Sequence, residues 1–461
     1  MKKVIFIIMM LLSVFCLSAC GSSTPAPTNF KIENGVASWD AVNGATKYRL
    51  EFTGASTQKR VVNETSVELD SLSLPFGTYT VNVRAITDKG EGELTTDNLT
   101  YECVDDSEKI SSLAGNAMTD GRFVKWTGRT EYNTQKEAMT VFHSASGLEV
   151  KFNGTDVEVV IESSKYGVTN SKYHPYVSVV LDNQYSNYNY KQHRIRLTEQ
   201  ETTVKLSDYF NVAEDGQTHT FTLLKSTEST DSHIYVKSVS TNGYFIEGVE
   251  YKERKIEVIA ASSSTGYGNI PEGDEKTSSN SDALQAFAFL SAQDLNAEIN
   301  IYSASGWGCT DSKWNPGKSV YASYKKVDFS SSNDWNFASY SPDVIVINLG
   351  TNDWSWINEA KTPTEKERRM QQFFDDYVEF LTFLDNIYQD TTIIVFYGLM
   401  NESDMFGITN EIYNEAKKVI PDLEIIQVEG DGAGIASHPS AQSHREVANN
   451  LVAKIKAVKG W

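Results

Sequence analysis

Four short segments in the carboxy-terminal half of the chain contain the residue types that acyl transfer requires. Ser262, Gly306 and Asn352 each follow an apolar run, and His438 stands before a proline near the end. A serine hydroxyl becomes a nucleophile when a nearby histidine removes its proton. Backbone N–H groups and an asparagine amide are donors that can stabilise an oxyanion. The residue types therefore favour nucleophilic catalysis on an ester.

The apolar runs before these segments are predicted to be strands of one sheet. Strand-like runs at 256–260, 298–303, 343–349, 392–398 and 423–428 alternate with helical stretches. This alternation predicts an α/β domain over residues 251–461, with a parallel sheet and helices on both faces. Active sites of such sheets lie at the carboxyl ends of the strands. We therefore expect the sheet to bring the four segments together.

Two helices of this domain are predicted from periodicity and from capping. The apolar residues of 281–295 lie on one helical stripe. The sequence TPTE at 362–365 combines an N-cap threonine, a proline at the first helical position and a glutamate at the third. It should begin an amphipathic helix that runs to about Ile387.

The order of these segments resembles that of the SGNH hydrolases. The most specific part is GTND at 350–353, directly after a buried strand. The resemblance implies Ser262 as nucleophile and His438 as general base. It also implies an oxyanion hole formed by the N–H groups of Ser262 and Gly306 and by the Asn352 side chain. No Cys/His cluster has the spacing of a zinc site, so we expect neither a metal nor a cofactor.

Residues 109–461 as a whole resemble carbohydrate esterase family 2. The shared features are a strand-rich region before the α/β domain, with HTFTLLKSTES in it, and TGYGN just after the serine. The resemblance implies removal of acetyl groups from plant polysaccharides such as acetylated xylan and glucomannan. The alternatives are a non-catalytic glycan-binding protein on the same fold and an esterase or lipase for other acyl chains.

Two positions depart from the family pattern. The usual Gly-Asp-Ser is Ala260-Ala261-Ser262, and the position of the triad aspartate, two residues before the histidine, is Ala436. The expected catalytic unit is therefore a serine–histidine dyad. A backbone carbonyl near Ala436 is the favoured partner for the second ring nitrogen of His438, ahead of Asp431.

Some residues compete for these roles. Ser263 and Ser264 adjoin the nucleophile, but alignment with the family block selects Ser262. His444 lies six residues after His438, within the expected helix, where a packed or solvated side chain is the better interpretation.

Four aromatic residues are candidates for contact with a sugar. Trp307, Trp354 and Trp356 follow the glycine and asparagine segments, and Tyr397 ends the fourth strand. Their rings could stack on the substrate at the mouth of the site, or they could simply pack in the core.

The first 20 residues are typical of a bacterial lipoprotein signal. Lys2 and Lys3 precede an apolar run that is too short to span a bilayer and ends in LSAC. Cys20 is then the lipid-carrying residue, and 21–28 is a flexible linker. We expect a protein of the bacterial cell surface that contacts the membrane only through this lipid anchor.

Two further β-rich domains are predicted between the linker and the α/β domain. Residues 29–103 alternate in period two and resemble a fibronectin type III module, a usual spacer. Residues 109–250 are predicted to form a jelly-roll-like β-sandwich, with a hairpin at Asn153-Gly154.

Charge and cysteine content narrow the possible partners. The chain has 41 basic and 61 acidic residues, a formal charge of −20, and loss of Lys2 and Lys3 makes it more negative. Binding to nucleic acid depends on cationic side chains, so no nucleic-acid partner is expected. Cys103 and Cys309 could form one disulfide but no disulfide framework.

Overall fold

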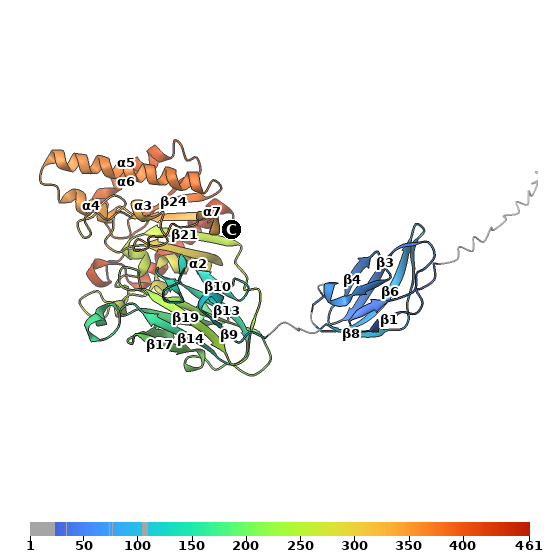
Figure 1. Cartoon of the computed structure of the whole chain (residues 1–461). Helices are drawn as coiled ribbons and strands as arrows, with labels where there is room; N and C mark the ends of the chain where they lie inside the picture. Colours follow the sequence, from blue (N-terminus) through green and yellow to red (C-terminus); the bar gives the residue numbers. More distant parts are fainter. Residues whose placement is uncertain (1–23, 34, 73, 76, 104–108) are drawn as a thin grey trace, which may run out of the picture. The chain divides into compact units, whose positions relative to one another are not determined.

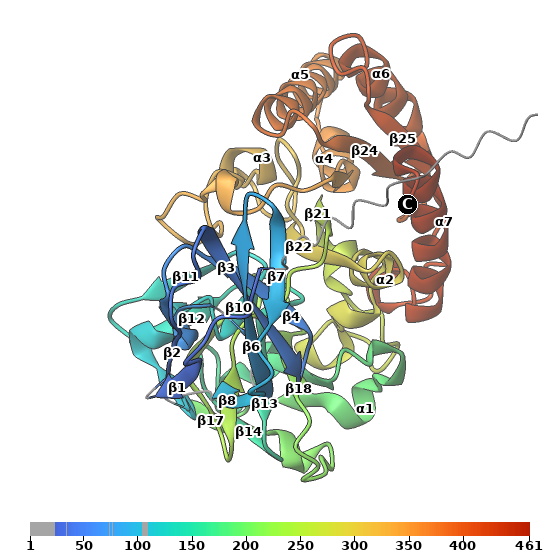
Figure 2. The same cartoon turned by 90° about the vertical axis from the view of Figure 1, so that its right-hand side faces the viewer.

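The computed structural model describes residues 24–461 except 34, 73, 76 and 104–108. The predicted signal peptide and Cys20 lie outside the described residues. The chain divides into two compact units, residues 1–108 and 109–461, which are considered separately below (Figures 1 and 2). No helix in the described part of the chain is long and apolar enough to cross a bilayer.

The described part of the first unit is a small antiparallel β-sandwich. Its strands are β1 (Lys31–Glu33), β2 (Val36–Ser38), β3 (Ala45–Gly54), β4 (Gln58–Val62), β5 (Ser66–Glu68), β6 (Gly77–Thr87), β7 (Gly90–Leu94) and β8 (Leu99–Cys103). One sheet has the order β1-β2-β5, and the other has the order β4-β3-β6-β7 with β8 also paired to β6. The alternate residues Tyr79, Val81, Val83 and Ala85 of β6 are fully buried, which confirms the period-two alternation predicted for this segment.

The second unit begins with a larger antiparallel sandwich. Its strands are β9 (Ser112–Ala114), β10 (Val124–Thr127), β11 (Thr130–Asn133), β12 (Ala138–Val141), β13 (Ser146–Asn153), β14 (Val157–Ser163), β15 (Tyr176–Leu181), β16 (Arg194–Arg196), β17 (Glu201–Lys205), β18 (His219–Lys225), β19 (Ile234–Thr241) and β20 (Tyr244–Ile246). The sheets have the orders β10-β13-β18-β15-β16 and β11-β12-β19-β14-β17, with β20 paired to β13 and β9 to β19.

The predicted hairpin at Asn153-Gly154 is wrong. β13 and β14 belong to opposite sheets, so this turn carries the chain across the sandwich. The reason is that Phe152 before the turn and Val157 after it are both fully buried in the core between the two sheets. Asn242 fixes the corner by accepting the N–H of Thr155 at 2.9 Å. A turn dipeptide alone does not distinguish a hairpin from such a corner.

The parallel sheet predicted for the α/β region is confirmed. Its strands are β21 (Arg254–Ala260), β22 (Ala297–Ser303), β23 (Val344–Asn348), β24 (Thr392–Tyr397) and β25 (Glu424–Gln427), in the order β22-β21-β23-β24-β25. The longer helices are α2 (Phe287–Asp294), α4 (Thr351–Asn358), α5 (Pro363–Ile387), α6 (Phe406–Ala416) and α7 (Ala441–Lys459). All of the described strand pairs in this sheet are parallel.

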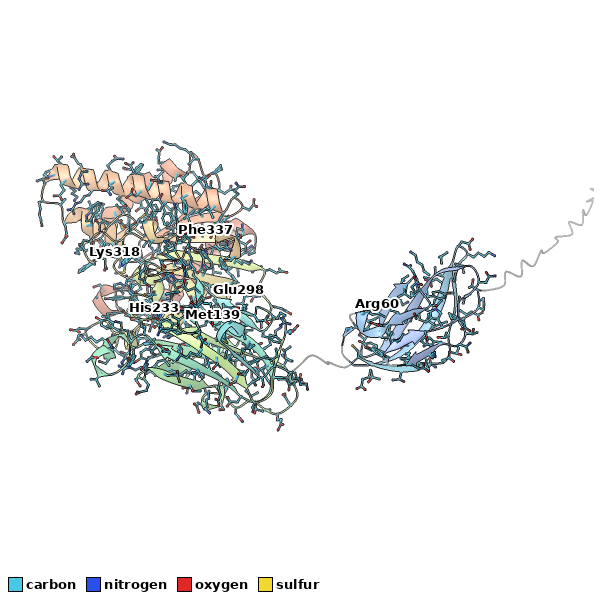
Figure 3. All side chains as sticks on the ribbon, viewed as in Figure 1. Arg60, Met139, His233, Glu298, Lys318 and Phe337 are labelled. Carbon is cyan, nitrogen blue, oxygen red and sulfur yellow. The ribbon has the colours of Figure 1, made fainter. Side chains whose placement is uncertain are left out.

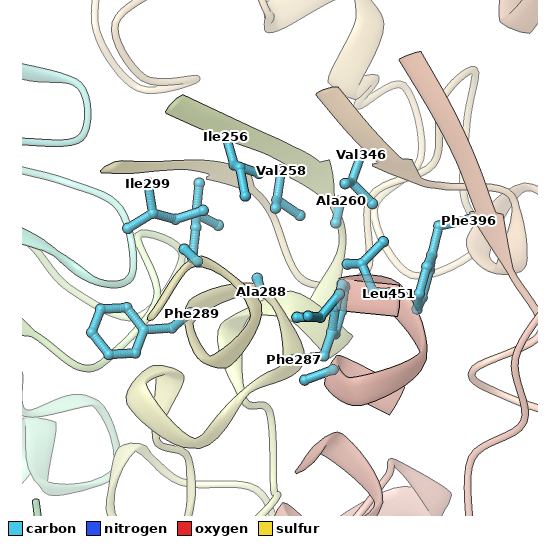
Figure 4. Close-up of a cluster of buried hydrophobic side chains, with 14 of the residues drawn as sticks. Ile256, Val258, Ala260, Phe287, Ala288, Phe289, Ile299, Val346, Phe396 and Leu451 are labelled. Carbon is cyan, nitrogen blue, oxygen red and sulfur yellow. The ribbon is translucent and has the colours of Figure 1, made fainter. Parts of the chain in front are cut away.

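Helices cover both faces of the parallel sheet. On one face, Ile256, Val258 and Ala260 of β21 pack with Phe287 of α2 and Leu451 of α7 (Figure 4). On the other face, the alternate strand residues pack with side chains of α5 and α6. A buried parallel strand needs apolar residues on both faces, which explains the continuous apolar runs in the sequence.

The two predicted helix starts have different outcomes. Thr362 accepts the N–H of Glu365 at 3.1 Å, and α5 ends at Ile387, so the N-cap and the helix are confirmed. The Glu365 carboxylate accepts the Lys361 N–H at 2.8 Å, one residue before the N-cap position that a capping box uses. The helix predicted over 281–295 begins only at Phe287, because Ala286 is extended. Asp282 accepts the N–H of Leu284 and holds the preceding residues in a separate short turn.

Buried ion pairs join the sandwich to the parallel sheet. The guanidinium of Arg129 lies 2.9 Å from Glu257 of β21, and both side chains are fully buried. Lys125 of β10 lies 3.1 Å from Glu298 of β22. Figure 3 shows Glu298 and Phe337, an aromatic neighbour of Arg129, among the side chains of this unit. The sandwich and the α/β region therefore form one compact unit.

Candidate active site

The serine and the histidine predicted to form the dyad meet at the end of β21. β21 stops at Ala260, and Ser262 begins a short 3-10 turn, Ser262–Thr265. The Ser262 Oγ lies 2.8 Å from the Nε2 of His438, which comes from the loop before α7. This is a hydrogen-bond distance, so the hydroxyl can donate its proton to the ring.

Backbone carbonyls hold the other ring nitrogen of His438. Its Nδ1 lies 3.2 Å from the carbonyl oxygen of Ile435 and 3.3 Å from that of Ala436. A carbonyl only accepts, so Nδ1 carries the proton and Nε2 is left to accept from Ser262. This partner is the one that the sequence favoured.

Asp431 is engaged elsewhere. Its carboxylate accepts the Ser440 N–H at 2.9 Å, the Ala433 N–H at 3.1 Å, and the Ser440 hydroxyl. Burial raises the pKa of Asp431, but these hydrogen bonds outweigh burial and leave the pKa below its ordinary value. Asp431 therefore stabilises the loop and the start of α7 rather than the imidazole.

The loop that supplies the two carbonyls is held in an unusual conformation. Ala436 and Ser437 both have positive φ, 53° and 60°, a region that costs a non-glycine residue about 1 kcal/mol or more. The loop is tied to the nucleophile segment, because the Ile435 N–H donates to the Gly268 carbonyl at 2.9 Å. A side chain at Gly268 would lie 2.5 Å from the Ile435 Cβ, so the glycine permits this close approach.

The environment of His438 suits a general base. Burial lowers the pKa of His438 below 6.5, although hydrogen bonds to the Ala436 and Ile435 carbonyls raise it in part. The ring stacks on Tyr267, with centroids 4.2 Å apart. At neutral pH the imidazole is therefore uncharged and able to take a proton.

The predicted oxyanion donors lie in the same cavity as the dyad. Gly306 has a φ of 75°, and a side chain there would lie 2.6 Å from the Asn315 amide nitrogen. The Asn352 amide donates to the Trp307 carbonyl at 2.8 Å, which fixes its plane. An amide has two N–H bonds, so the second can point at a substrate oxygen.

A buried carboxylate that the sequence analysis did not single out shapes this loop. Asp353 is fully buried and accepts the N–H groups of Cys309 at 2.8 Å and Thr310 at 2.7 Å. Burial raises the pKa of Asp353 to about 7, against the opposing effect of these hydrogen bonds. It ties α4 to the segment after Gly306. Cys309 is a free thiol that is fully buried within the second unit, so it is not accessible for the disulfide with Cys103 that the sequence allowed.

The site opens into a cavity of about 570 Å³. Its lining includes Ser262, Gly306, Asn352 and His438, and also Trp314, whose ring is 64% exposed. Trp314 was missed because it lies in a loop with no strand or motif beside it. A larger cavity of about 870 Å³ is lined by residues such as Lys125 and Tyr185 and contains none of the four segments.

The four aromatic residues predicted to contact sugar do not line this cavity, which corrects that expectation. Trp307 and Trp354 are buried in the core between the sheet and α5, and Trp356 packs against the same core. Tyr397 is buried and its hydroxyl is hydrogen-bonded to Gln427 at 3.1 Å. Each ring has a packing partner outside the cavity. Trp354 and Trp356 lie beside side chains of α5, Trp307 packs on Phe329, and Tyr397 packs on Phe406 of α6.

The rival residues are placed away from the chemistry or bonded elsewhere. Ser264 is fully buried, and its hydroxyl is 2.5 Å from that of Ser303. Ser263 lines the cavity, but the hydroxyl that lies at hydrogen-bond distance from His438 is that of Ser262. His444 is fully buried and accepts the Phe287 N–H at 3.3 Å, as expected for a packed histidine.

Sequence comparison relates the chain to esterases. No protein-family model matches it. The cellulase/esterase CelE of Acetivibrio thermocellus is 28% identical over 355 residues, which cover 74% of this chain and 40% of that protein. An acetylxylan esterase / glucomannan deacetylase of Cellvibrio japonicus is 29% identical over 225 residues, 45% of this chain and 61% of that protein. The chain thus spans less than two thirds of these two relatives.

Solved structures give the same relationship. A family two carbohydrate esterase from Clostridium thermocellum, in complex with cellohexaose, has a TM-score of 0.63 at 25% identity, over 73% of this chain and 99% of that one. The acetyl xylan esterase Est2A from Butyrivibrio proteoclasticus has a TM-score of 0.65 at 21% identity, over 77% and 100%. In fold and in sequence the chain is similar to the family two carbohydrate esterases.

Proposed function

We propose that this chain is a carbohydrate esterase that removes O-acetyl groups from plant polysaccharides of the acetylated xylan or glucomannan type. The observation that carries the proposal is the 2.8 Å contact between the Ser262 Oγ and the His438 Nε2, inside a cavity that Asn352 also lines. The named activities of the relatives, acetylxylan esterase and glucomannan deacetylase, support the substrate class.

The geometry supports a two-step reaction through an acetyl-enzyme. Ser262 Oγ attacks the acetyl carbonyl carbon while His438 Nε2 takes the hydroxyl proton. The N–H groups of Ser262 and Gly306 and the Asn352 amide stabilise the negative oxygen of the tetrahedral intermediate. The intermediate collapses with cleavage of the ester bond, and His438 gives its proton to the departing sugar oxygen. Water, deprotonated by His438, then releases acetate and regenerates Ser262.

His438 performs these transfers without a carboxylate partner. The carbonyls of Ile435 and Ala436 orient the ring, but they supply no negative charge to the imidazolium that forms. The stacked Tyr267 ring contributes electron density at the face of that cation. No step requires a metal or a cofactor, so treatment with a chelator should leave the activity intact.

The exposed face of Trp314 is the candidate contact for a sugar ring. It is the one tryptophan that lines the cavity among the described residues. Aromatic faces stack on the apolar faces of pyranose rings, so Trp314 would bind the polysaccharide beside the acetylated unit. Trp314→Ala should raise KM for an acetylated oligosaccharide and leave hydrolysis of a small acetyl ester nearly unchanged.

The experiment that tests the function is acetate release. The parent should release acetate from acetylated xylan or glucomannan, and Ser262→Ala should not. A panel of esters from acetyl to octanoyl separates a deacetylase from an esterase for longer chains. Binding of glycan without any acetate release would instead identify a non-catalytic glycan-binding protein.

We further propose a lipid-anchored protein of the cell surface, with residues 29–103 as a fibronectin-like spacer. The support is the LSAC sequence that ends at Cys20 and the separate, two-sheeted fold of the described module. Cys20→Ser should release the protein from the membrane fraction. Retention of that variant in the membrane fraction would contradict the anchor.

A further inference from the structure

A loop of the larger sandwich reaches the catalytic segments. The loop follows β18, and its residue Glu228 is only 3% exposed. The Glu228 Oε2 accepts the backbone N–H of Ser305 at 3.2 Å. Ser305 directly precedes Gly306, so this contact sets the orientation of the peptide that leads to the predicted oxyanion donor.

The second carboxylate oxygen of Glu228 leads to the histidine. Its Oε1 accepts from the Lys276 Nζ at 2.7 Å, and Asp231 accepts from the same Nζ at 2.5 Å. The ammonium lies 5.1 Å from the centroid of the Tyr267 ring. The Tyr267 ring in turn stacks on His438. One carboxylate therefore touches the glycine segment directly and the histidine through two side chains.

The loop that carries Glu228 is fixed in place. Lys225 is fully buried, and its Nζ donates to the carbonyls of Thr227 at 2.7 Å and Glu228 at 3.0 Å. The Ser229 hydroxyl donates to Asp328 at 2.7 Å. Buried polar groups with this many partners hold a single geometry, since any displacement leaves a charge or a hydrogen-bonding group unpaired.

The carboxylate remains charged in this position. Burial raises the pKa of Glu228, but Lys276 and the Ser305 N–H lower it, and the balance lies below the ordinary value. Burial also lowers the pKa of Lys276, while Glu228 and Asp231 raise it further, to above its ordinary value. The charged groups that act on His438 from neighbouring elements are Glu228, which raises its pKa, and Lys276, which lowers it.

We propose that Glu228 of the sandwich is a positioning residue for the catalytic site: it holds the Ala304–Ser305 peptide, directly before Gly306, and, through Lys276 and Tyr267, the ring of His438. This inference rests on the proposed esterase function. It makes the sandwich a part of the catalytic apparatus rather than an attached domain. Because the donors and the base matter most in the transition state, loss of Glu228 should lower kcat more than it raises KM.

The test compares four proteins with the parent in hydrolysis of 4-nitrophenyl acetate. Glu228→Ala breaks both connections. Glu228→Gln keeps an oxygen for the Ser305 N–H but removes one of the two carboxylate charges that hold Lys276, and Lys276→Met removes the cation. The matched control is Glu298→Gln, which removes a buried charge from the same sandwich–sheet boundary, 3.1 Å from Lys125.

A second readout does not depend on the natural acyl group. A fluorophosphonate reacts when the Ser262 Oγ forms a bond to phosphorus, fluoride leaves, and His438 takes the hydroxyl proton. The rate of this labelling, followed by mass spectrometry, reports the alignment of nucleophile, base and oxyanion donors. Thermal unfolding of each variant shows whether it is folded.

We expect Glu228→Ala to lower kcat about 100-fold, the effect of losing one oxyanion donor, with KM within about threefold. Glu228→Gln and Lys276→Met should lower kcat about tenfold, and labelling should slow in parallel. Glu298→Gln should stay within about twofold of the parent in both assays. If Glu228→Ala does not fold, the kcat and labelling rate of Glu228→Gln decide the question.

The inference is overturned if folded Glu228→Ala hydrolyses 4-nitrophenyl acetate, and reacts with the fluorophosphonate, as fast as the parent does. If Glu228→Ala does not fold, the same result for Glu228→Gln overturns it. It is also overturned if Glu298→Gln is as slow as the Glu228 variants. If the parent is labelled but releases no acetate, the proposed function fails and the labelling rates alone judge Glu228. A parent that neither hydrolyses nor labels would contradict both.

Discussion

The two β-sandwiches of this chain are built differently on the inside. The module before residue 104 has an apolar core, and its ion pair between Arg49 and Glu51 keeps nearly a fifth of each side chain exposed. The sandwich after residue 109 buries Arg129 and Lys225 completely and directs them and Glu228 to the boundary with the α/β region. Buried charges need fixed partners, and two of these are in the α/β region: Glu257 pairs with Arg129, and Lys276 pairs with Glu228.

This difference separates a self-contained module from a structural part of the catalytic unit. An apolar core is complete within its own two sheets, so such a module can be removed. Without the α/β region, the charges that the larger sandwich buries at the boundary would lose their partners. The predictions below test this contrast, from the largest expected effect to the smallest.

The largest effect is expected at the histidine of the catalytic unit. His438→Ala removes the general base and should lower kcat on a small acetyl ester about a thousandfold or more. Asp431→Ala should keep kcat within about tenfold, because Asp431 binds Ser440 and Ala433 rather than the imidazole. If folded Asp431→Ala is as slow as His438→Ala, Asp431 is the third member of a displaced triad.

Breaking the buried ion pair at the sandwich boundary should lower the free energy of unfolding much more than breaking an exposed pair. Arg129→Met leaves Glu257 buried without its cation and should lower the free energy of unfolding by about 3–5 kcal/mol. Tryptophan fluorescence in urea reports on this unit, because Trp39 is the one tryptophan before residue 104. The exposed pair of Arg445 and Asp294 is the control, and Arg445→Ala should cost about 1 kcal/mol or less. Equal losses in the two variants would contradict the account.

The pH dependence of kcat/KM should report the pKa of His438, which burial lowers. Only the neutral ring of His438 can take the serine proton, so activity falls as pH drops through its pKa. Burial lowers that pKa, so half-maximal kcat/KM should lie below pH 6.5. Asp353, whose pKa is about 7, must be excluded as the source of this acidic limb. If His438 is the source, Asp353→Asn leaves the limb in place. A limb centred above pH 7 would mean that His438 is not the titrating base.

The smallest effect is expected when the first module is removed. A protein that begins near Ser107 should keep its kcat on a small acetyl ester within about tenfold, or roughly 1.4 kcal/mol of barrier. The reason is that the module completes its own core, and that the dyad and the predicted oxyanion donors all belong to the second unit. A larger fall, with the remaining protein folded, would show that the module helps to shape the site.

Local patterns in the sequence predicted much of the fold and the central residues of the site. Ser262 and His438 could be chosen because the order of the strand-end segments resembles that of the SGNH hydrolases, and the same resemblance identified Ala436 as the position of the missing aspartate. Trp314, Asp353 and Glu228 could not be chosen. Their roles depend on contacts between segments far apart in the chain, such as Glu228 with Ser305, and no local periodicity encodes these.

The aromatic residues show a second limit of sequence-based prediction: residues chosen for their place in the sequence are buried in the core. Trp307 and Trp354 stand next to the predicted oxyanion residues in the sequence, yet they point into the core. Proximity along the chain sets where a backbone lies, but the packing of the following segment decides which way a large ring points. The turn at Asn153-Gly154 was misread for a similar reason, because the strand partners beyond it belong to different sheets.

The most direct test of the central claim is the release of acetate from acetylated glucomannan or xylan by the parent and by Ser262→Ala. The account predicts acetate release by the parent and a loss of about a thousandfold or more in the variant, together with a mass increase of one acetyl group on Ser262 when the parent reaction is quenched early. Acetate release that persists in folded Ser262→Ala, or none from the parent, would contradict it.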